Sequence, residues 1–194
     1  RRRNFLGAAG ASLLAGCNRI ADSDTGGRLL RAAEDWHRKA HGLLARPHAL
    51  APEFSPADIS PSFRGNGTIN PGGAAYKAHA ATRFANWRLR VGGLVEHPLV
   101  LTLDDIRALP QRTQITRHDC VEGWSAIGQW RGPPLGDILE IAGVKDSARY
   151  IIFHCADLYH GKNYYESIDM FDAFHPQTIL AWQMNNAPIT VPHG

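Results

Sequence analysis

Short strand-like and helix-like segments alternate irregularly from Trp87 onward, and this order constrains the fold more than any other feature. The stretch WRLRVGGLV alternates apolar and basic residues as a strand does, and PLVLTLDDIRALP then predicts a strand followed by a short helix. Thr102 suits the N-cap of that helix, and Pro110 is a stop signal. The regular spacing of a doubly wound sheet is missing, so the pattern predicts an α+β domain over residues 87–194, to which residues 60–86 contribute.

The later segments keep this mixed character. TQITRH predicts a strand that delivers Cys120 to a loop, and LGDILEIAG predicts a short amphipathic helix that Gly143 closes. RYIIFHC and TILAWQM predict two buried strands, which an acidic and aromatic connection joins. Asn185-Asn186 predicts a tight turn before PITV.

The residues before the domain predict an arm that wraps around it. Residues 18–50 are polar and alanine-rich with a helical tendency, whereas residues 51–71 carry four prolines and little periodicity. We therefore interpret residues 18–86 as an N-terminal arm. The chain has no initiator Met and stops directly after a strand-like run, so we expect a domain that is truncated at its C-terminus.

Residues 1–17 predict an export signal. Arg2-Arg3 followed by NFL forms the core of a twin-arginine signal, and the apolar run from Leu6 to Leu14 is too short to span a bilayer. LAGC then resembles a lipobox, which makes Cys17 a candidate for a lipid anchor. We expect a periplasmic protein, either released or tethered. Because the twin-arginine route exports folded proteins, it also favours an enzyme that receives a cofactor before export.

The charge of the chain argues against nucleic-acid binding. The sequence has 21 basic and 18 acidic residues, a net charge of +3, and the three arginines at positions 1–3 account for all of it. Subtracting them leaves a net charge of zero for the remainder. A neutral chain lacks the basic surface that nucleic-acid binding requires.

Cys120 lies among charged and hydrogen-bonding residues rather than apolar ones, in the stretch TRHDCVEGW. Such company suits a thiolate, which Arg117 and His118 would help to keep ionised. The alternative is a disulfide between Cys120 and Cys155, because an oxidising compartment permits one.

TRHDCVEGWSAIGQWRGPPLGDIL resembles the central motif of the sulfite oxidase-type molybdopterin enzymes, a family that includes the periplasmic methionine-sulfoxide reductase catalytic subunits. Three further stretches are similar in order and spacing. FRGNGTINP resembles a pterin-contacting loop, NYYESIDMFDAFHPQTILAWQMNNAPI resembles the substrate-side segment with its following strands, and PHG resembles the start of a second pterin loop. The resemblance covers about residues 60–194 and implies a sulfite oxidase-like fold.

The resemblance also implies roles for individual residues. Cys120 corresponds to the one protein ligand of a molybdenum that a single molybdopterin holds, and it is thus both a metal and a catalytic residue. Tyr164 corresponds to the tyrosine beside the metal, where a phenol donates to a developing oxyanion. The residues that correspond to pterin contacts are Asn66, Gly67, Thr68, Cys155 and His193.

One departure from the family pattern narrows the expected activity. Sulfite oxidases have an Arg-Asn-His run where this chain has Gly65-Asn66-Gly67, so an arginine for a sulfite dianion is missing there. We expect two-electron oxygen-atom transfer on a small sulfur-containing or sulfoxide substrate. No C-x-x-C-H haem motif occurs in the sequence, which favours a separate haem or cytochrome partner. The alternative is a cofactor-free binding or structural periplasmic lipoprotein with the same fold.

Overall fold

The computed structural model describes residues 23–44, 49–65 and 68–193, and the chain forms two compact units, residues 1–47 and 48–194. The first unit contains one described helix, α2 (Asp24–Leu44). It lies within the segment that the sequence predicts to be helical. The export signal, Cys17, Asn66 and Gly67 lie outside the described residues. None of the described helices is both long and apolar enough to cross a membrane.

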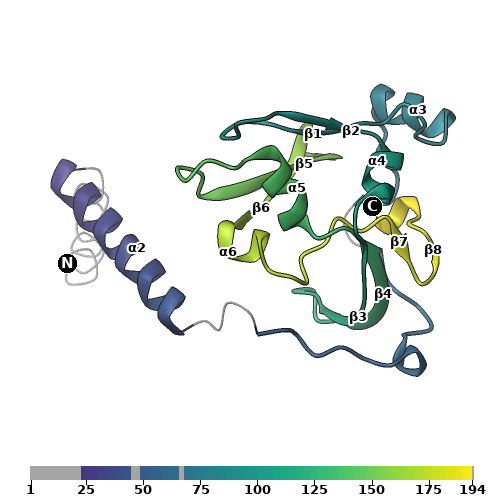
Figure 1. The fold of residues 1–194 in the computed structure, drawn as a ribbon, viewed down its shortest axis with the longest axis horizontal. Helices are drawn as coiled ribbons and strands as arrows, with labels where there is room; N and C mark the ends of the chain where they lie inside the picture. The colour runs from purple at the N-terminus through teal and green to yellow at the C-terminus, as the bar shows by residue number, and fades with distance from the viewer. Residues whose placement is uncertain (1–22, 45–48, 66–67, 194) are drawn as a thin grey trace, which may run out of the picture. The chain divides into compact units, whose positions relative to one another are not determined.

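The second unit is built from antiparallel strand pairs and short helices, which confirms the predicted α+β class (Figure 1). Its three sheets have the strand orders β1-β2, β3-β4-β7-β8 and β5-β6. The strands are β1 (Leu89–Val91), β2 (Leu99–Leu101), β3 (Arg112–Asp119), β4 (Ser125–Gly132), β5 (Tyr150–Tyr159), β6 (Lys162–Asp169), β7 (Gln183–Met184) and β8 (Ala187–Pro188). The helices and 3₁₀ turns are η1 (Pro56–Asp58), α3 (Ala74–Ala81), α4 (Leu103–Ala108), α5 (Leu135–Ala142), α6 (Met170–Ala173) and η2 (Val191–His193).

Local sequence signals set the boundaries of several elements as predicted. Thr102 caps α4: its hydroxyl accepts a hydrogen bond from the backbone of Asp105 at 3.0 Å, and the Asp105 carboxylate accepts one from the backbone of Thr102 at 2.8 Å. Gly143 ends α5 in the left-handed conformation with φ of +64°. Asn185 and Asn186 both have positive φ and turn the chain from β7 into β8.

Two strand predictions need correction. The acidic and aromatic connection expected after RYIIFHC contains strand β6, which pairs with β5 from Tyr150↔Asp169 to Tyr159↔Lys162. The sequence did not predict β6, because this strand is exposed along almost its whole length and its residues are mostly polar. The predicted strand TILAWQM forms a regular strand only at Gln183–Met184. Strand β5, which was predicted to be buried, has exposed and partly buried residues in alternation.

The core of the second unit lies around α5. Ile138 and Ala142 have no exposed surface, and Leu135 and Leu139 pack with Ala173 of α6. The partly buried residues packed against this cluster are Val144, Ile151, Phe153 and Ile168. Helix α5 therefore joins the β5–β6 hairpin to the rest of the unit.

The segment after α6 is hydrogen-bonded to the end of β4. The amide of Leu180 donates to the carbonyl of Pro133 at 2.9 Å, and the amide of Trp182 donates to that of Arg131 at 3.0 Å. Gly132 lies between them, and a Cβ added there would meet the Leu180 carbonyl oxygen at 2.0 Å. Only glycine permits this close approach of two backbones.

The segment before residue 65 runs along the β3–β4 hairpin. The amide of Phe54 donates to the carbonyl of Ile115 at 2.9 Å, and the amide of Ser60 donates to that of Ile127 at 3.0 Å. The Ser60 hydroxyl accepts from the amide of Ile127 at 2.9 Å. These bonds place the residues that follow, from Phe63 on, near the tip of the hairpin.

Candidate functional site

Cys120 lies in the tight turn that connects β3 to β4, as the sequence predicts. Its amide donates to the carbonyl of Trp124 at 2.9 Å, and its carbonyl accepts from the amide of Gly123 at 2.9 Å. Gly123 has φ of +86°, a conformation that favours glycine. The thiol is partly exposed, and the structure contains no Cys120–Cys155 disulfide. The turn thus presents a backbone-anchored thiol at the end of a hairpin.

Arg117 and Asp119, two charged residues just before Cys120, interact with each other. Arg117 Nε lies 3.1 Å from the carboxylate of Asp119, which also accepts a hydrogen bond from the Ser125 hydroxyl. The Ser125 bond, assisted by Arg117, lowers the pKa of Asp119. Burial lowers the pKa of His118, which favours the neutral ring. Arg117 is engaged by Asp119, and the expectation that Arg117 and His118 help to keep the Cys120 thiolate ionised stays a prediction.

The ring of Phe63 is the centre of an aromatic cluster beside this turn. It makes edge-to-face contacts with His118, Trp124, Trp130 and His193, at centroid distances of 5.5, 5.9, 5.4 and 5.8 Å. The His118 ring also stacks on Trp130 at 5.2 Å. Sequence reasoning missed Phe63, because no local pattern shows that residues from three distant segments meet there.

The C-terminal turn η2 joins the same cluster. His193 Nε2 lies 3.1 Å from the carbonyl oxygen of Phe63, and the Thr190 hydroxyl lies 3.2 Å from His193 Nδ1. Because a carbonyl only accepts, Nε2 donates to Phe63. A Cβ added to Gly65 would lie 3.0 Å from Pro192, so this glycine also lets the two segments approach. Thus His193 is an ordered part of the site.

The structure groups some of the predicted site residues around the hairpin tip. Phe63 connects the turn of Cys120 to His193 through ring contacts with Trp124 and His193. Gly65, at the start of the predicted pterin loop, lies against the residue before His193. Thr68 is described and exposed, further along that loop.

Tyr164 and Cys155 lie elsewhere, on the β5–β6 hairpin, which is a separate sheet from β3–β4. The Tyr164 hydroxyl donates to the carboxylate of Glu166, and this bond raises the pKa of Tyr164. The ring of Tyr159 packs on that of Tyr164 at 6.4 Å. A hollow of about 510 Å³ lies at this tip, and Tyr164 lines it with Lys162.

Cys155 belongs to the middle of β5. Its thiol lies 3.8 Å from the carbonyl of Phe153, and the side chain of Asn163 donates to the Cys155 carbonyl at 3.1 Å. Burial raises the pKa of the Cys155 thiol, so this cysteine is held as the neutral thiol. Each of these partners lies in the same hairpin.

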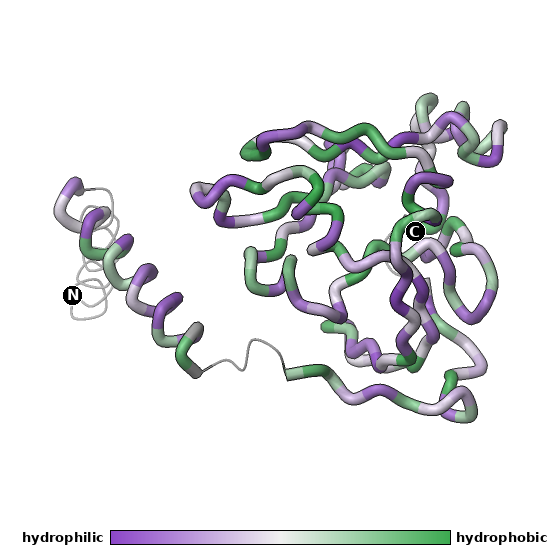
Figure 2. The backbone as a smooth tube through the Cα atoms, in the orientation of Figure 1, coloured by the Kyte–Doolittle hydropathy of each residue, from purple (hydrophilic) through white to green (hydrophobic). Residues whose placement is uncertain are grey.

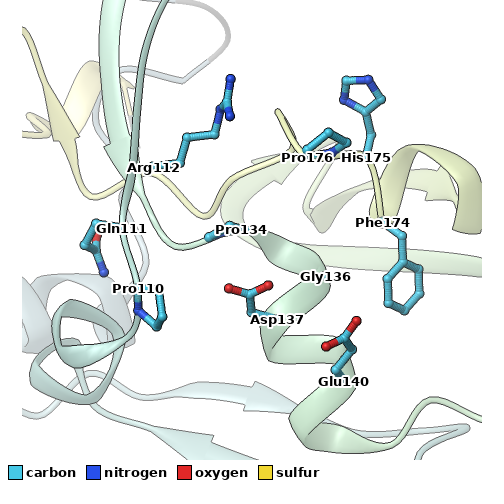
Figure 3. Close-up of a pocket in the computed structure, with 10 residues that line it drawn as sticks. All are labelled: Pro110, Gln111, Arg112, Pro134, Gly136, Asp137, Glu140, Phe174, His175 and Pro176. Atoms are coloured by element: carbon cyan, nitrogen blue, oxygen red, sulfur yellow. The ribbon is translucent and has the colours of Figure 1, made fainter. Parts of the chain in front are cut away.

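Another hollow, of about 310 Å³, opens at the far end of β3 (Figure 3). Asp137 and Glu140 extend their carboxylates from α5 beside Phe174. Arg112, the first residue of β3, also lines it. A strand rises about 3.3 Å per residue, so β3 separates this hollow from Cys120 by about 25 Å. The hollow is therefore not part of the Cys120 site.

Residues 76–194 match the family described as oxidoreductase molybdopterin binding domain. The chain belongs to this family. The match covers more than half of the chain, and it confirms the sulfite oxidase-type resemblance of the Cys120 motif. The fold of this molybdopterin-binding oxidoreductase is similar to the sulfane dehydrogenase SoxCD from Paracoccus pantotrophus, with a TM-score of 0.51 and 25% identity, over 57% of this chain and 32% of that one.

Curated relatives extend the comparison. The chain is 38% identical over 200 residues to a protein of Azospira oryzae that carries the provisional name protein-methionine-sulfoxide reductase subunit YedZ1, over all of this chain and 71% of that protein. It is 35% identical over 109 residues to the uncharacterized oxidoreductase YuiH of Bacillus subtilis, and the match covers 56% of this chain and 52% of YuiH. It is 33% identical over 129 residues to the protein-methionine-sulfoxide reductase catalytic subunit MsrP of Xanthomonas axonopodis pv. citri, and the match covers 61% of this chain and 40% of MsrP. The chain thus spans about half the length of YuiH and less of MsrP.

The residues around Cys120 fit the molybdenum cofactor that the family name implies. A thiol on a backbone-anchored, partly exposed turn offers the soft sulfur that suits a high-valent metal. Among the described residues, no group of three or more His, Cys, Asp or Glu is arranged to hold a metal ion. The spacing of His154, His160 and His175 in the sequence also fits no tetrahedral zinc site.

Proposed function

We propose that this molybdopterin-binding domain holds one molybdenum through Cys120 and catalyses two-electron oxygen-atom transfer on a small sulfur-containing or sulfoxide substrate. The observation that carries the proposal is the Cys120 turn, which lies inside the family domain and is connected by Phe63 to His193. The names of the relatives YedZ1 and MsrP favour the sulfoxide as substrate.

The proposed reaction sets what the chain must provide. Reduction of a sulfoxide breaks the S–O bond, consumes two electrons and two protons, and releases a sulfide and water. The bound molybdenum supplies a centre that accepts and returns two electrons. The chain holds this group in place, with Cys120 as ligand and with pterin contacts from Asn66, Gly67, Thr68, Cys155 and His193. In His193 the side chain is already oriented, because Thr190 and Phe63 engage both ring nitrogens.

Tyr164 is the proposed donor to the substrate oxygen, for which its hydroxyl has to turn from Glu166, its present acceptor. The bond to Glu166 raises the pKa of Tyr164, so the phenol keeps its proton throughout the neutral range. A protonated phenol stabilises negative charge that develops on a neighbouring oxygen. The hollow that Tyr164 lines also contains Lys162, whose positive charge attracts a polar S–O group.

Export and electron supply complete the proposal. The twin-arginine motif in residues 1–17 supports a periplasmic location, with Cys17 as a candidate lipid anchor. Electrons must reach the site one at a time from a donor, and the sequence contains no haem motif. A separate haem or cytochrome partner is therefore part of the proposal.

Metal analysis of protein purified from its native host tests the proposal. Wild type should contain about one molybdenum per chain, and Cys120→Ser should lose the metal because a hydroxyl is a poorer ligand than a thiolate. Val100→Ser is the control, because this exposed residue of β2 has no part in the proposed site, and it should keep the metal. A full metal load in Cys120→Ser would refute the role of Cys120. No molybdenum in the wild type would favour the alternative, a cofactor-free binding lipoprotein.

A further inference from the structure

Helix α2 has one apolar side that is exposed along its length. Leu29, Ala33, Trp36, Ala40 and Leu43 follow one another at spacings of four and three residues, which places them on one side of a helix. The exposed fractions are 69% for Leu29, 71% for Trp36 and 87% for Leu43. Figure 2 shows hydrophobic and hydrophilic residues alternating along this helix. Large apolar side chains exposed in a row indicate a surface that binds something.

The other side of α2 is charged, and Arg38 there forms an ion pair with Asp35 at 2.6 Å. Arg28 donates to the hydroxyl of Thr25 at 3.3 Å. At 100° per residue, Arg28 and Lys39 lie at the border of the apolar side. A basic residue at that border has an apolar stem and a charged end that reaches outward.

We propose that α2 lies flat in the surface of a phospholipid membrane, with its apolar side among the acyl chains and its basic border at the phosphates. A separated apolar and charged side, tryptophan and leucine on the first and Lys or Arg at its edge are the features of interfacial helices. The helix begins seven residues after Cys17, so it is close in sequence to the candidate lipid anchor. The proposal does not depend on the function of the domain or on acylation.

The composition of the apolar side favours lipid over a second copy of the chain. In a helical pair Ala33 and Ala40 would occupy every second position of the seam, where they bury little apolar area. Leu30 broadens the apolar side beyond such a seam, and it is 57% exposed. Lipid acyl chains accommodate a broad and uneven apolar side, because they are fluid.

The charge of α2 predicts which force dominates. Four basic residues and three acidic ones give the helix a net charge of 4 − 3 = +1. So small a charge adds little attraction to anionic lipid, and the apolar side must provide most of the affinity. Removing apolar side chains should therefore weaken binding more than removing the lipid charge does.

Vesicle co-sedimentation tests the proposal on the full-length chain. The background carries Leu13→Glu, Leu14→Glu and Cys17→Ser, so that neither the apolar run of the signal nor acylation contributes. Vesicles of phosphatidylglycerol and phosphatidylcholine are compared with vesicles of phosphatidylcholine alone. Leu29→Ser/Trp36→Ser is the test variant. Leu94→Ser/Val100→Ser is the matched control, because these side chains are 52% and 55% exposed in the second unit.

We expect the partition coefficient to fall about tenfold or more in the test variant, to stay within about twofold in the control, and to fall only a few-fold without anionic lipid. Equal binding of the test and control variants would overturn the proposal. So would sedimentation velocity that shows, without vesicles, a dimer that the test variant loses.

Discussion

Gly132 provides the sharpest test of how the Cys120 hairpin is attached to the rest of the unit. A Cβ at this position would lie 2.0 Å from the Leu180 carbonyl oxygen and 2.8 Å from the Ala181 Cα, and both are backbone atoms. In Gly132→Ala the two segments must therefore separate by about 1.5 Å to reach an ordinary contact distance. That shift stretches the hydrogen bonds that flank Gly132, from Leu180 to Pro133 and from Trp182 to Arg131.

The expected cost follows from those bonds. Each backbone hydrogen bond contributes about 1 kcal/mol, and poorer packing adds a similar amount, so Gly132→Ala should lower the free energy of unfolding by about 2–4 kcal/mol. Urea denaturation followed by circular dichroism measures it. Gly72→Ala is the matched control, because a Cβ there meets nothing within 4 Å. If the two variants unfold with the same free energy, the close backbone approach at Gly132 is refuted.

Three further predictions concern the aromatic cluster, the hairpin tip and α4. Phe63→Leu removes edge-to-face contacts with four rings, so the free energy of unfolding in urea should fall by about 2 kcal/mol, and no change would contradict the cluster. Tyr164→Phe should lower kcat for sulfoxide reduction by about 100-fold at an unchanged molybdenum content, whereas an unchanged kcat would exclude Tyr164 as donor. Hydrogen bonds from Thr102 lower the pKa of Asp105 below its ordinary value of 3.8. The ionised Asp105 carboxylate therefore stabilises the fold above pH 3.8, and this stabilisation is lost as the pH falls through the lowered pKa. The Tm difference between wild type and Asp105→Asn should accordingly disappear in strong acid. A difference that persists there would show that the stabilisation does not come from the ionised carboxylate of Asp105.

Features that depend on neighbouring residues were predictable from the sequence. The Thr102 cap, the left-handed Gly143 and the Asn185-Asn186 turn each arise from the chemistry of one or two residues. The turn at Cys120 was predictable for the same reason, because a strand pattern ends just before it. Strand β6 was not, since its exposed polar residues lack the alternation that marks a half-buried strand.

Features that depend on distant residues were not predictable from local patterns. The contact between Phe63 and His193 joins residues 130 positions apart, and no periodicity signals such a pair. The lowered pKa of His118 depends on its burial against two other rings, which only the fold reveals. Arg117 had the expected charge, but its partner Asp119 lies on the same strand and was not considered.

The bond between His193 and Phe63 has a consequence for when the site can be assembled. Residues 63 and 193 lie near the start and the end of the described part of the second unit, and closing so long a loop must wait for both ends. During synthesis the hairpin of Cys120 therefore emerges from the ribosome well before its C-terminal neighbour exists. A ligand that needs both sides of this cluster can therefore be bound only after residue 193 has been synthesised.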